Sequence, residues 1–136
     1  VSCGGNLLMN VGPTARGTFD DRALAALGVY RDWMKVNSRS IYGCTQSEFA
    51  APPDCRLTQN GKRLYLHIFA WPFRNIHLDG MAGRVEYAQL LHDASEIGFL
   101  DAGDVEYQGL GAGTLTLELP VRKPDVLVPV VELFLK

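Results

Sequence analysis

The fold is decided near the start of the chain, by the stretch Gly5-Asn6-Leu7-Leu8-Met9-Asn10-Val11-Gly12-Pro13. Its centre is an almost continuous apolar run, and turn residues stand at both ends. A run of this kind, without alternation of polar and apolar side chains, is typical of a strand buried on both faces, as in a parallel sheet or a barrel. We therefore expect a buried strand at Asn6–Val11.

A helix is expected after this strand and a short loop. Asp20 and Asp21 are typical helix-start residues, because a carboxylate there accepts hydrogen bonds from free N–H groups at the positive end of the helix dipole. From Asp21 to Val36 the apolar residues form one stripe at helical spacing, made of Ala23, Leu27, Tyr30 and Met34 and widened by Leu24 and Trp33. The strand, loop and helix together are a β/α unit. Adjacent helical residues do not face each other, so the two aspartates are interpreted as capping residues and not as a catalytic pair.

Beyond a proline-containing boundary at Cys44–Asp54, the sequence becomes typical of β-structure. Asn60-Gly61 separates two strand-like runs, Arg56–Gln59 and Arg63–Phe69, and Asn-Gly in such a place predicts a tight hairpin. Both faces of the second run are apolar. We therefore expect it to be a central strand that is covered on both sides.

More strands are expected where short apolar runs lie between turn residues, at Asn75–Leu78, Arg84–Leu91, Ile97–Leu100, Thr114–Leu119 and Val126–Leu135. In the fourth of these, the leucines should face the core while Thr116 and Glu118 face outward. Pro129 inside the last run predicts an edge strand or a bulge. Short strands at this spacing, with no second helix, predict an antiparallel β-sandwich.

The stretch from Gly5 to Pro13 resembles a segment of the family 29 α-L-fucosidases. The one difference is that this chain has Met9 where the family segment has leucine. The resemblance continues in order through Gly17, the Trp33-Met34 pair and the turn Ile41-Tyr42-Gly43, and then through the hairpin from Asn60 to His67 and Trp71-Pro72. Ser38 stands where the family often has glycine. The match is closest from Gly4 to Gly43 and extends to about Phe73.

This resemblance implies a mainly β chain in two parts: residues 1–45 as the last strand and helix of a catalytic (β/α)8 TIM barrel, and residues 46–136 as a C-terminal antiparallel β-sandwich. It implies a retaining α-L-fucosidase, which hydrolyses α-L-fucosidic bonds in oligosaccharides or glycoconjugates with two carboxylates about 5–5.5 Å apart. In the family both carboxylates precede the segment that opens this chain. We therefore expect no catalytic residue here, a scaffold role, and a chain that is part of a longer protein.

Three residues are candidates for contact with sugar. Asn10 ends the first expected strand, and in a barrel that end is the active-site face; its amide could also serve only to satisfy loop backbone. Trp71 and Tyr65 could stack on sugar rings, and Phe73, two residues after Trp71, belongs to the same aromatic group. These aromatic side chains could instead pack in the core or at a domain interface.

Two other functional classes stay open. A free-standing carbohydrate-binding β-sandwich would show an exposed aromatic platform and bind sugar without a barrel. A purely structural or oligomerisation domain would bind no sugar and would present a large apolar surface around Leu7–Met9 and the helix.

Composition excludes several partners. The formal charge of −2 and the lack of basic clusters argue against nucleic acid and anionic membranes. His67, His77 and His92 fall on separate expected strands and are interpreted as packed or surface residues, so no metal or other cofactor is expected. Cys44 and Cys55 could be bridged across their short connection, or all three cysteines could be free thiols in a reducing compartment such as the cytoplasm. The expected partners are the rest of the barrel, a fucosylated glycan and a second copy of the protein.

Overall fold

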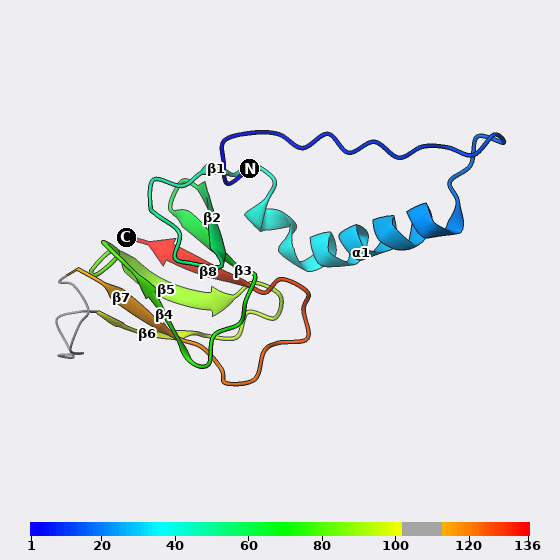
Figure 1. Ribbon diagram of the computed structural model, residues 1–136. Coiled ribbons are helices and arrows are strands. Elements are labelled where there is room, and N and C mark those ends of the chain that lie inside the picture. The colour runs from blue at the N-terminus through cyan, green and yellow to red at the C-terminus, as the bar shows by residue number, and fades with distance from the viewer. Residues whose placement is uncertain (102–112) are drawn as a thin grey trace.

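The computed structural model describes residues 1–101 and 113–136 and is mainly β-structure with one α-helix (Figure 1). The helix is α1 (Asp21–Asn37), and the 3-10 turn η1 (Ser38–Ser40) follows it directly. The strands are β1 (Thr45–Gln46), β2 (Cys55–Asn60), β3 (Arg63–Ile68), β4 (Asn75–Leu78), β5 (Val85–Leu90), β6 (Gly98–Asp101), β7 (Leu115–Glu118) and β8 (Val130–Leu135). All sheet pairings are antiparallel among the described residues.

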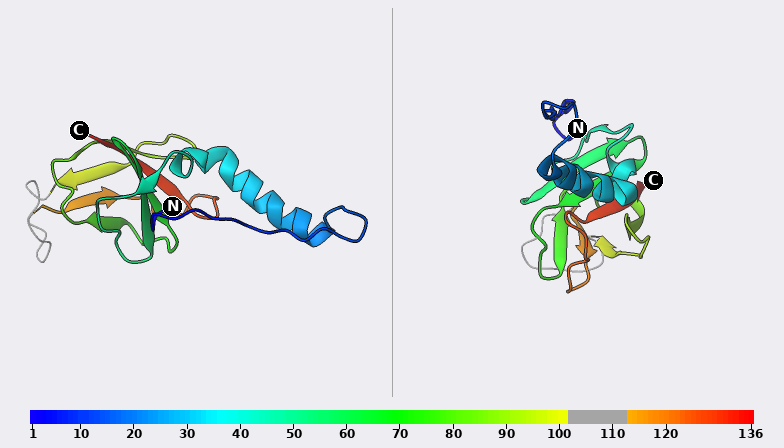
Figure 2. Two further views of the ribbon diagram at one scale, coloured as in Figure 1. Left: turned by 90° about the horizontal axis from the view of Figure 1, so that it is seen from above. Right: turned by 90° about the vertical axis from the view of Figure 1, so that its right-hand side faces the viewer.

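Helix α1 starts where its capping chemistry predicts. The Asp20 carboxylate accepts a hydrogen bond of 2.8 Å from the backbone N–H of Ala23, and Asp21 lies in the first turn. The apolar stripe is only partly covered: Trp33 and Met34 are half-buried near the C-terminal end, while Tyr30 remains 53% exposed. Figure 2 shows the reason, because α1 projects away from the β-structure and only its C-terminal end lies against it.

The segment before α1 differs from the expectation. Asn6–Val11 is extended but belongs to none of the strands, and Leu7 and Leu8 are more than four-fifths exposed. The prediction of a strand is therefore wrong for the chain by itself. The physical reason is that a strand needs neighbouring strands to pair its N–H and C=O groups, and the described residues place none beside this segment.

The first sheet has five strands in the order β1-β2-β3-β8-β5. The predicted hairpin forms, but its turn is Gly61-Lys62 and not Asn60-Gly61, because Asn60 is the last residue of β2 and pairs with Arg63. Gly61 has a positive φ and Asn60 does not. Strand β3 is central, with five of its six residues buried. Strand β8 lies between β3 and β5, so the prediction of an edge strand is wrong. The strand begins after Pro129, which therefore removes no ladder hydrogen bond. Strand β1 falls inside the segment predicted to be a boundary without strands, and it pairs with the end of β2.

The second sheet has three strands in the order β4-β7-β6. Leu115 and Leu117 of β7 are fully buried, as their alternation predicts, and Glu118 is exposed. Thr116 was expected to face solvent but is 5% exposed, because β7 is the central strand and the His77 ring covers the Thr116 hydroxyl from β4.

The main core lies between the two sheets. It contains leucines from both, among them Leu64 and Leu66 of β3 and Leu115 and Leu117 of β7. The other face of β3 belongs to a smaller cluster in which Tyr65 packs with Leu91, Val130, Trp33 and Cys44. The C-terminal end of α1 therefore covers the outer face of the five-stranded sheet, which accounts for the apolar pattern on both faces of β3.

Candidate functional site

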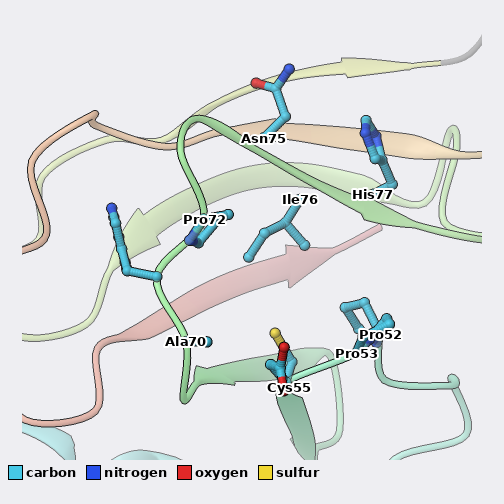
Figure 3. Close-up of a pocket in the computed structure, with 10 residues that line it drawn as sticks. Pro52, Pro53, Cys55, Ala70, Pro72, Asn75, Ile76 and His77 are labelled. Carbon is cyan, nitrogen blue, oxygen red and sulfur yellow. The ribbon is translucent and has the colours of Figure 1, made fainter.

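A pocket of about 310 Å³ opens at the edge where the two sheets meet (Figure 3). Three segments form it: the proline turn before β2, the Ala70-Trp71-Pro72 turn after β3, and the start of β4. Its wall is mostly apolar. In Figure 3 Ile76 points toward the middle of the pocket, whereas Asn75 and His77 rise to the other side of their strand.

Trp71 is held firmly in this wall. Its indole N–H donates a hydrogen bond of 3.1 Å to the carbonyl oxygen of Pro120, and its ring packs on the edge of the main core. The side chain is half-buried, so part of the ring faces the pocket. A fixed, partly open indole is able to stack on a flat apolar ligand face.

The polar groups around the pocket are few. Asn75 Oδ1 is buried and accepts no hydrogen bond from the described residues. His77 Nδ1 lies 2.9 Å from Thr116 Oγ1. Cys55 also lines the pocket, and burial raises the pKa of its thiol to about 11, so the sulfur stays protonated and is a poor nucleophile at neutral pH. The Asp54 carboxylate also lines the pocket. The arrangement can bind a ligand, and the Cys55 thiol is not activated for reaction.

Tyr65 and Trp71 are not brought together. Tyr65 is 4% exposed and lies in the cluster beneath α1, while Trp71 packs against the core between the sheets. Burial raises the pKa of the Tyr65 phenol to about 12, with the nearby Glu132 carboxylate adding to the effect. In this chain Tyr65 has almost no surface to offer a sugar. Phe73 is 80% exposed but does not line the pocket.

Asn10 lies in the extended, exposed segment before α1. Its expected place at the end of a barrel strand depends on neighbours that the described residues do not include. No sugar-contact role for it can be built from the geometry of this chain alone, and it stays a prediction.

A second group of polar residues joins α1 and η1 to the five-stranded sheet, and we call it the helix–sheet junction: Ser40, Thr58, His67, Arg39, Glu132 and Gln89. The Thr58 hydroxyl donates a hydrogen bond of 2.6 Å to the backbone carbonyl of Ser40 and lies 3.1 Å from His67 Nε2. The His67 ring is 6% exposed and stacks on Trp33 at 6.1 Å between centroids. Burial lowers the pKa of His67 to about 4, so the imidazole is neutral at neutral pH.

The rest of the junction centres on a buried carboxylate. Glu132 is 2% exposed and lies between Tyr65 and Gln89, its partners on the neighbouring strands. Gln89 Nε2 donates a hydrogen bond of 2.7 Å to Glu132 Oε2. The guanidinium group of Arg39, a residue of η1, lies 3.4 Å from the same oxygen. Trp33 adds a further tie, because its indole N–H donates to the carbonyl oxygen of Val128 at 3.0 Å.

Sequence reasoning missed this junction. His67 was interpreted as a packed or surface residue, and it is packed. Glu132 and Gln89 were not singled out. The available signal was a glutamate inside the apolar run from Val126 to Leu135, since a charge there must be either exposed or paired.

The described residues also limit other chemistry. In residues 1–101 and 113–136, no three histidine, cysteine or carboxylate side chains gather in a way that could hold a metal ion. The thiols of Cys3, Cys44 and Cys55 are unbridged. None of the helices in this part of the chain is long and apolar enough to cross a membrane.

Comparison with known proteins gives one consistent family. A family model described as alpha-L-fucosidase matches residues 1–39. Human plasma alpha-L-fucosidase is 40% identical over 81 residues, which cover 53% of this chain and 16% of the relative. The alpha-L-fucosidase of Dictyostelium discoideum is 46% identical over 43 residues, covering 32% of this chain and 9% of the relative.

Solved structures extend the likeness to nearly the whole chain. Alpha-L-fucosidase isoenzyme 1 from Paenibacillus thiaminolyticus superposes with a TM-score of 0.85 at 37% identity, over 97% of this chain and 31% of that one. A family 29 alpha-L-fucosidase from Bacteroides thetaiotaomicron shows the same fold at 24% identity, with a TM-score of 0.84 over 100% of this chain and 29% of that one.

The chain thus spans less than a third of the length of these relatives and structures. All of them are named alpha-L-fucosidases, and the Bacteroides thetaiotaomicron enzyme is named a member of family GH29. The chain is similar to part of these alpha-L-fucosidases, and to the Paenibacillus enzyme at 37% identity over 97% of this chain.

Proposed function

We propose that residues 1–45 are the last strand and helix of a (β/α)8 TIM barrel, that residues 46–136 are the β-sandwich following it, and that both belong to a retaining α-L-fucosidase. The intact enzyme hydrolyses α-L-fucosidic bonds in oligosaccharides or glycoconjugates. The main support is the superposition on an alpha-L-fucosidase at 37% identity over 97% of this chain. On this basis we assign the same activity to the intact protein that contains the chain.

In this proposal the chain supplies scaffold and no catalytic carboxylate. The unpaired segment from Asn6 to Val11 gains its neighbours from the rest of the barrel, and Asn10 then lies at the active-site face. The helix–sheet junction fixes the sandwich to the C-terminal end of α1, so the sandwich braces the last β/α unit through buried hydrogen bonds. The further partners are a fucosylated glycan and, for the intact protein, a second copy.

An activity assay with an aryl α-L-fucoside tests the proposal. The protein that contains this chain together with its upstream barrel should release the aryl group with retention of anomeric configuration, and the 136-residue chain alone should release none. Replacement of Asn10 by alanine in the intact protein should lower kcat/KM. Fucosidase activity in the isolated chain would contradict the scaffold assignment, and inactivity of the intact protein would contradict the fucosidase assignment.

A free-standing carbohydrate-binding module is the second candidate, and one observation favours it: part of the Trp71 ring faces a pocket of about 310 Å³. Titration calorimetry of the isolated chain with fucose and fucosylated oligosaccharides decides between the two. Sugar binding that is lost in Trp71→Ala and kept in Phe73→Ala would support the binding module, because Phe73 is exposed outside the pocket. No heat of binding in the wild-type chain would exclude it.

A further inference from the structure

The hairpin of β2 and β3 contains an asparagine directly before a glycine, Asn60-Gly61. The Asn60 side chain is exposed, and it forms no hydrogen bond with the residues that the structure describes. The backbone N–H of Gly61 donates no hydrogen bond to them either. The two groups are therefore free to react with each other when the turn moves.

Asparagine is a chemically labile residue, because its side-chain Cγ can be attacked by the backbone nitrogen of the next residue. Two conditions decide whether this attack occurs in a folded chain. A side chain on the next residue obstructs the approach, so a glycine there permits it best. The asparagine must also be able to leave its folded conformation, because the attack closes a ring that extended backbone does not allow.

The chain contains five asparagines, all of them within the described residues: Asn6, Asn10, Asn37, Asn60 and Asn75. Asn6 and Asn10 are exposed, but a leucine and a valine follow them. Asn37 is followed by a small serine, but it is fully buried, and its amide donates a hydrogen bond of 3.1 Å within α1. Asn75 is followed by an isoleucine, and its Oδ1 is buried. Of the five, Asn60 alone is both exposed and followed by a glycine.

The position of Asn60 at the end of the hairpin makes the required movement small. Asn60 and Arg63 are the last pair of the β2–β3 ladder, so the turn opens when this one pair breaks and the rest of the ladder stays intact. Local opening of this kind at the end of an element costs little free energy. The cationic residues Lys62 and Arg63 follow directly, and positive charge nearby favours the deprotonated, nucleophilic form of the Gly61 nitrogen.

We propose that Asn60 is a site of deamidation in the folded chain. The Gly61 nitrogen loses its proton to hydroxide and forms a bond to Asn60 Cγ. The Cγ–Nδ2 bond then breaks, and the side-chain nitrogen takes up a proton and leaves as ammonia. Water opens the resulting succinimide ring at either of its two carbonyl groups, so that an aspartate or an isoaspartate stands at position 60. Water is the only co-reactant, and no oxidation or reduction takes place.

The product changes the charge and the geometry of the hairpin. One negative charge is added, which takes the formal net charge from −2 to −3. Isoaspartate also lengthens the main chain by one carbon, which disturbs the pairing of position 60 with Arg63. Asn60 Nδ2 lies 3.2 Å from the place that a Cβ on Gly43 would occupy, so the side chain also lies close to the turn before β1. The isoaspartate form should therefore unfold at a lower urea concentration than the unmodified chain.

Incubation of the folded chain in mildly alkaline buffer, followed by tryptic digestion and mass spectrometry, tests the proposal. Trypsin cleaves after Arg56 and Lys62, which places Asn60 in the peptide 57–62. A growing fraction of this peptide should gain about 1 Da and separate into two chromatographic forms, aspartate and isoaspartate. The peptide 36–39, which contains the buried Asn37, is the matched control and should change at least about tenfold more slowly.

Two variants locate the reaction. Asn60→Gln keeps a side-chain amide but lengthens it by one carbon, and should abolish the gain in mass. Gly61→Ala puts a Cβ on the attacking residue and should slow the gain. An equal rate in Gly61→Ala and the wild type would overturn the mechanism.

The free peptide 57–62 keeps the proposal testable if Gly61→Ala does not fold. No gain in mass at Asn60 of the folded wild-type chain, over a time in which the free peptide is converted, would overturn the proposal. An equal rate at Asn37 and Asn60 would overturn it as well. Fucosidase activity does not enter these measurements, so deamidation and the proposed function can each fail without the other.

Discussion

The buried His67 should make the chain less stable in mild acid. In the folded chain burial lowers the pKa of this imidazole from 6.5 to about 4. In the unfolded chain the ring binds a proton below about pH 6.5, so the unfolded state takes up more protons between these two values. Stability is therefore full above pH 6.5, falls as the pH drops through this window, and stops falling below about pH 4.

The size of the effect follows from the shift. A difference of about 2.5 pKa units corresponds to about 3 kcal/mol at the lower end of the window. Between pH 7 and pH 5 the loss is about 2 kcal/mol, a substantial part of the 5–15 kcal/mol by which domains are commonly stable. The destabilisation acts on the helix–sheet junction, because the charged imidazolium ring would lie against Trp33 and Thr58 with little access to water.

Urea denaturation at pH 7, 6 and 5, followed by tryptophan fluorescence, measures the loss. His67→Gln keeps a polar side chain beside Thr58 but removes the titration, and should flatten the dependence of the unfolding free energy on pH. His77→Gln is the matched control, since His77 is an exposed histidine on β4. The carboxylates whose pKa values are lowered, Asp32 and Asp93, titrate below this window.

Two results would refute the reasoning. The first is an equal pH dependence in the wild type and His67→Gln. The second is a flattening caused by His77→Gln and not by His67→Gln.

Three further changes have expected outcomes. Asp20→Ala removes the N-cap hydrogen bond of α1 and should destabilise the helix by about 1 kcal/mol, seen as a weaker helical signal in circular dichroism. Asp21→Ala should have the smaller effect, and the reverse order would contradict the assignment of Asp20 as the capping residue. Gly61→Ala places a side chain at a residue with φ +54 and should lower the unfolding free energy by about 1 kcal/mol. Gly28 lies in the helix with open space around it, so Gly28→Ala should not lower the unfolding free energy. Equal changes for the two variants in urea denaturation would argue against the positive φ of Gly61 in the turn. Glu132→Ala leaves the half-buried Gln89 amide without its acceptor and should lower the unfolding free energy by about 1–3 kcal/mol, against less than about 0.5 kcal/mol for the exposed Glu86→Ala. An unchanged unfolding free energy in Glu132→Ala would show that the helix–sheet junction does not stabilise the chain.

Local chemistry is the part of the fold that the sequence predicted well. The capping carboxylate of Asp20 and the hairpin between β2 and β3 each depend on a few consecutive residues, so they follow from neighbours in the sequence, although the turn is Gly61-Lys62 and not the predicted Asn60-Gly61. The two apolar faces of β3 correctly indicated a strand covered on both sides.

Features that depend on distant neighbours were predicted poorly. Pro129 was assigned to a strand expected at Val126–Leu135, but β8 begins at Val130, so the proline precedes the strand and gives no reason for an edge position. Asn6–Val11 has the composition of a buried strand but lacks pairing partners among the described residues. Glu132 could have been noticed as a charge inside an apolar run, but its partners could not be predicted, because they lie on β5 and η1 at long sequence separations.

The position of β8 between β3 and β5 has a consequence for the order of folding. Leu64 pairs with Leu133, and the chain between them includes the whole three-stranded sheet and β5. Closing so long a loop costs more entropy than closing the two-residue turn of the β2–β3 hairpin. The hairpin can therefore form early, while the free edge of β3 must wait for a distant partner, and contacts of this kind slow folding. During that interval β3 is an unpaired apolar edge, open to any other strand that reaches it first.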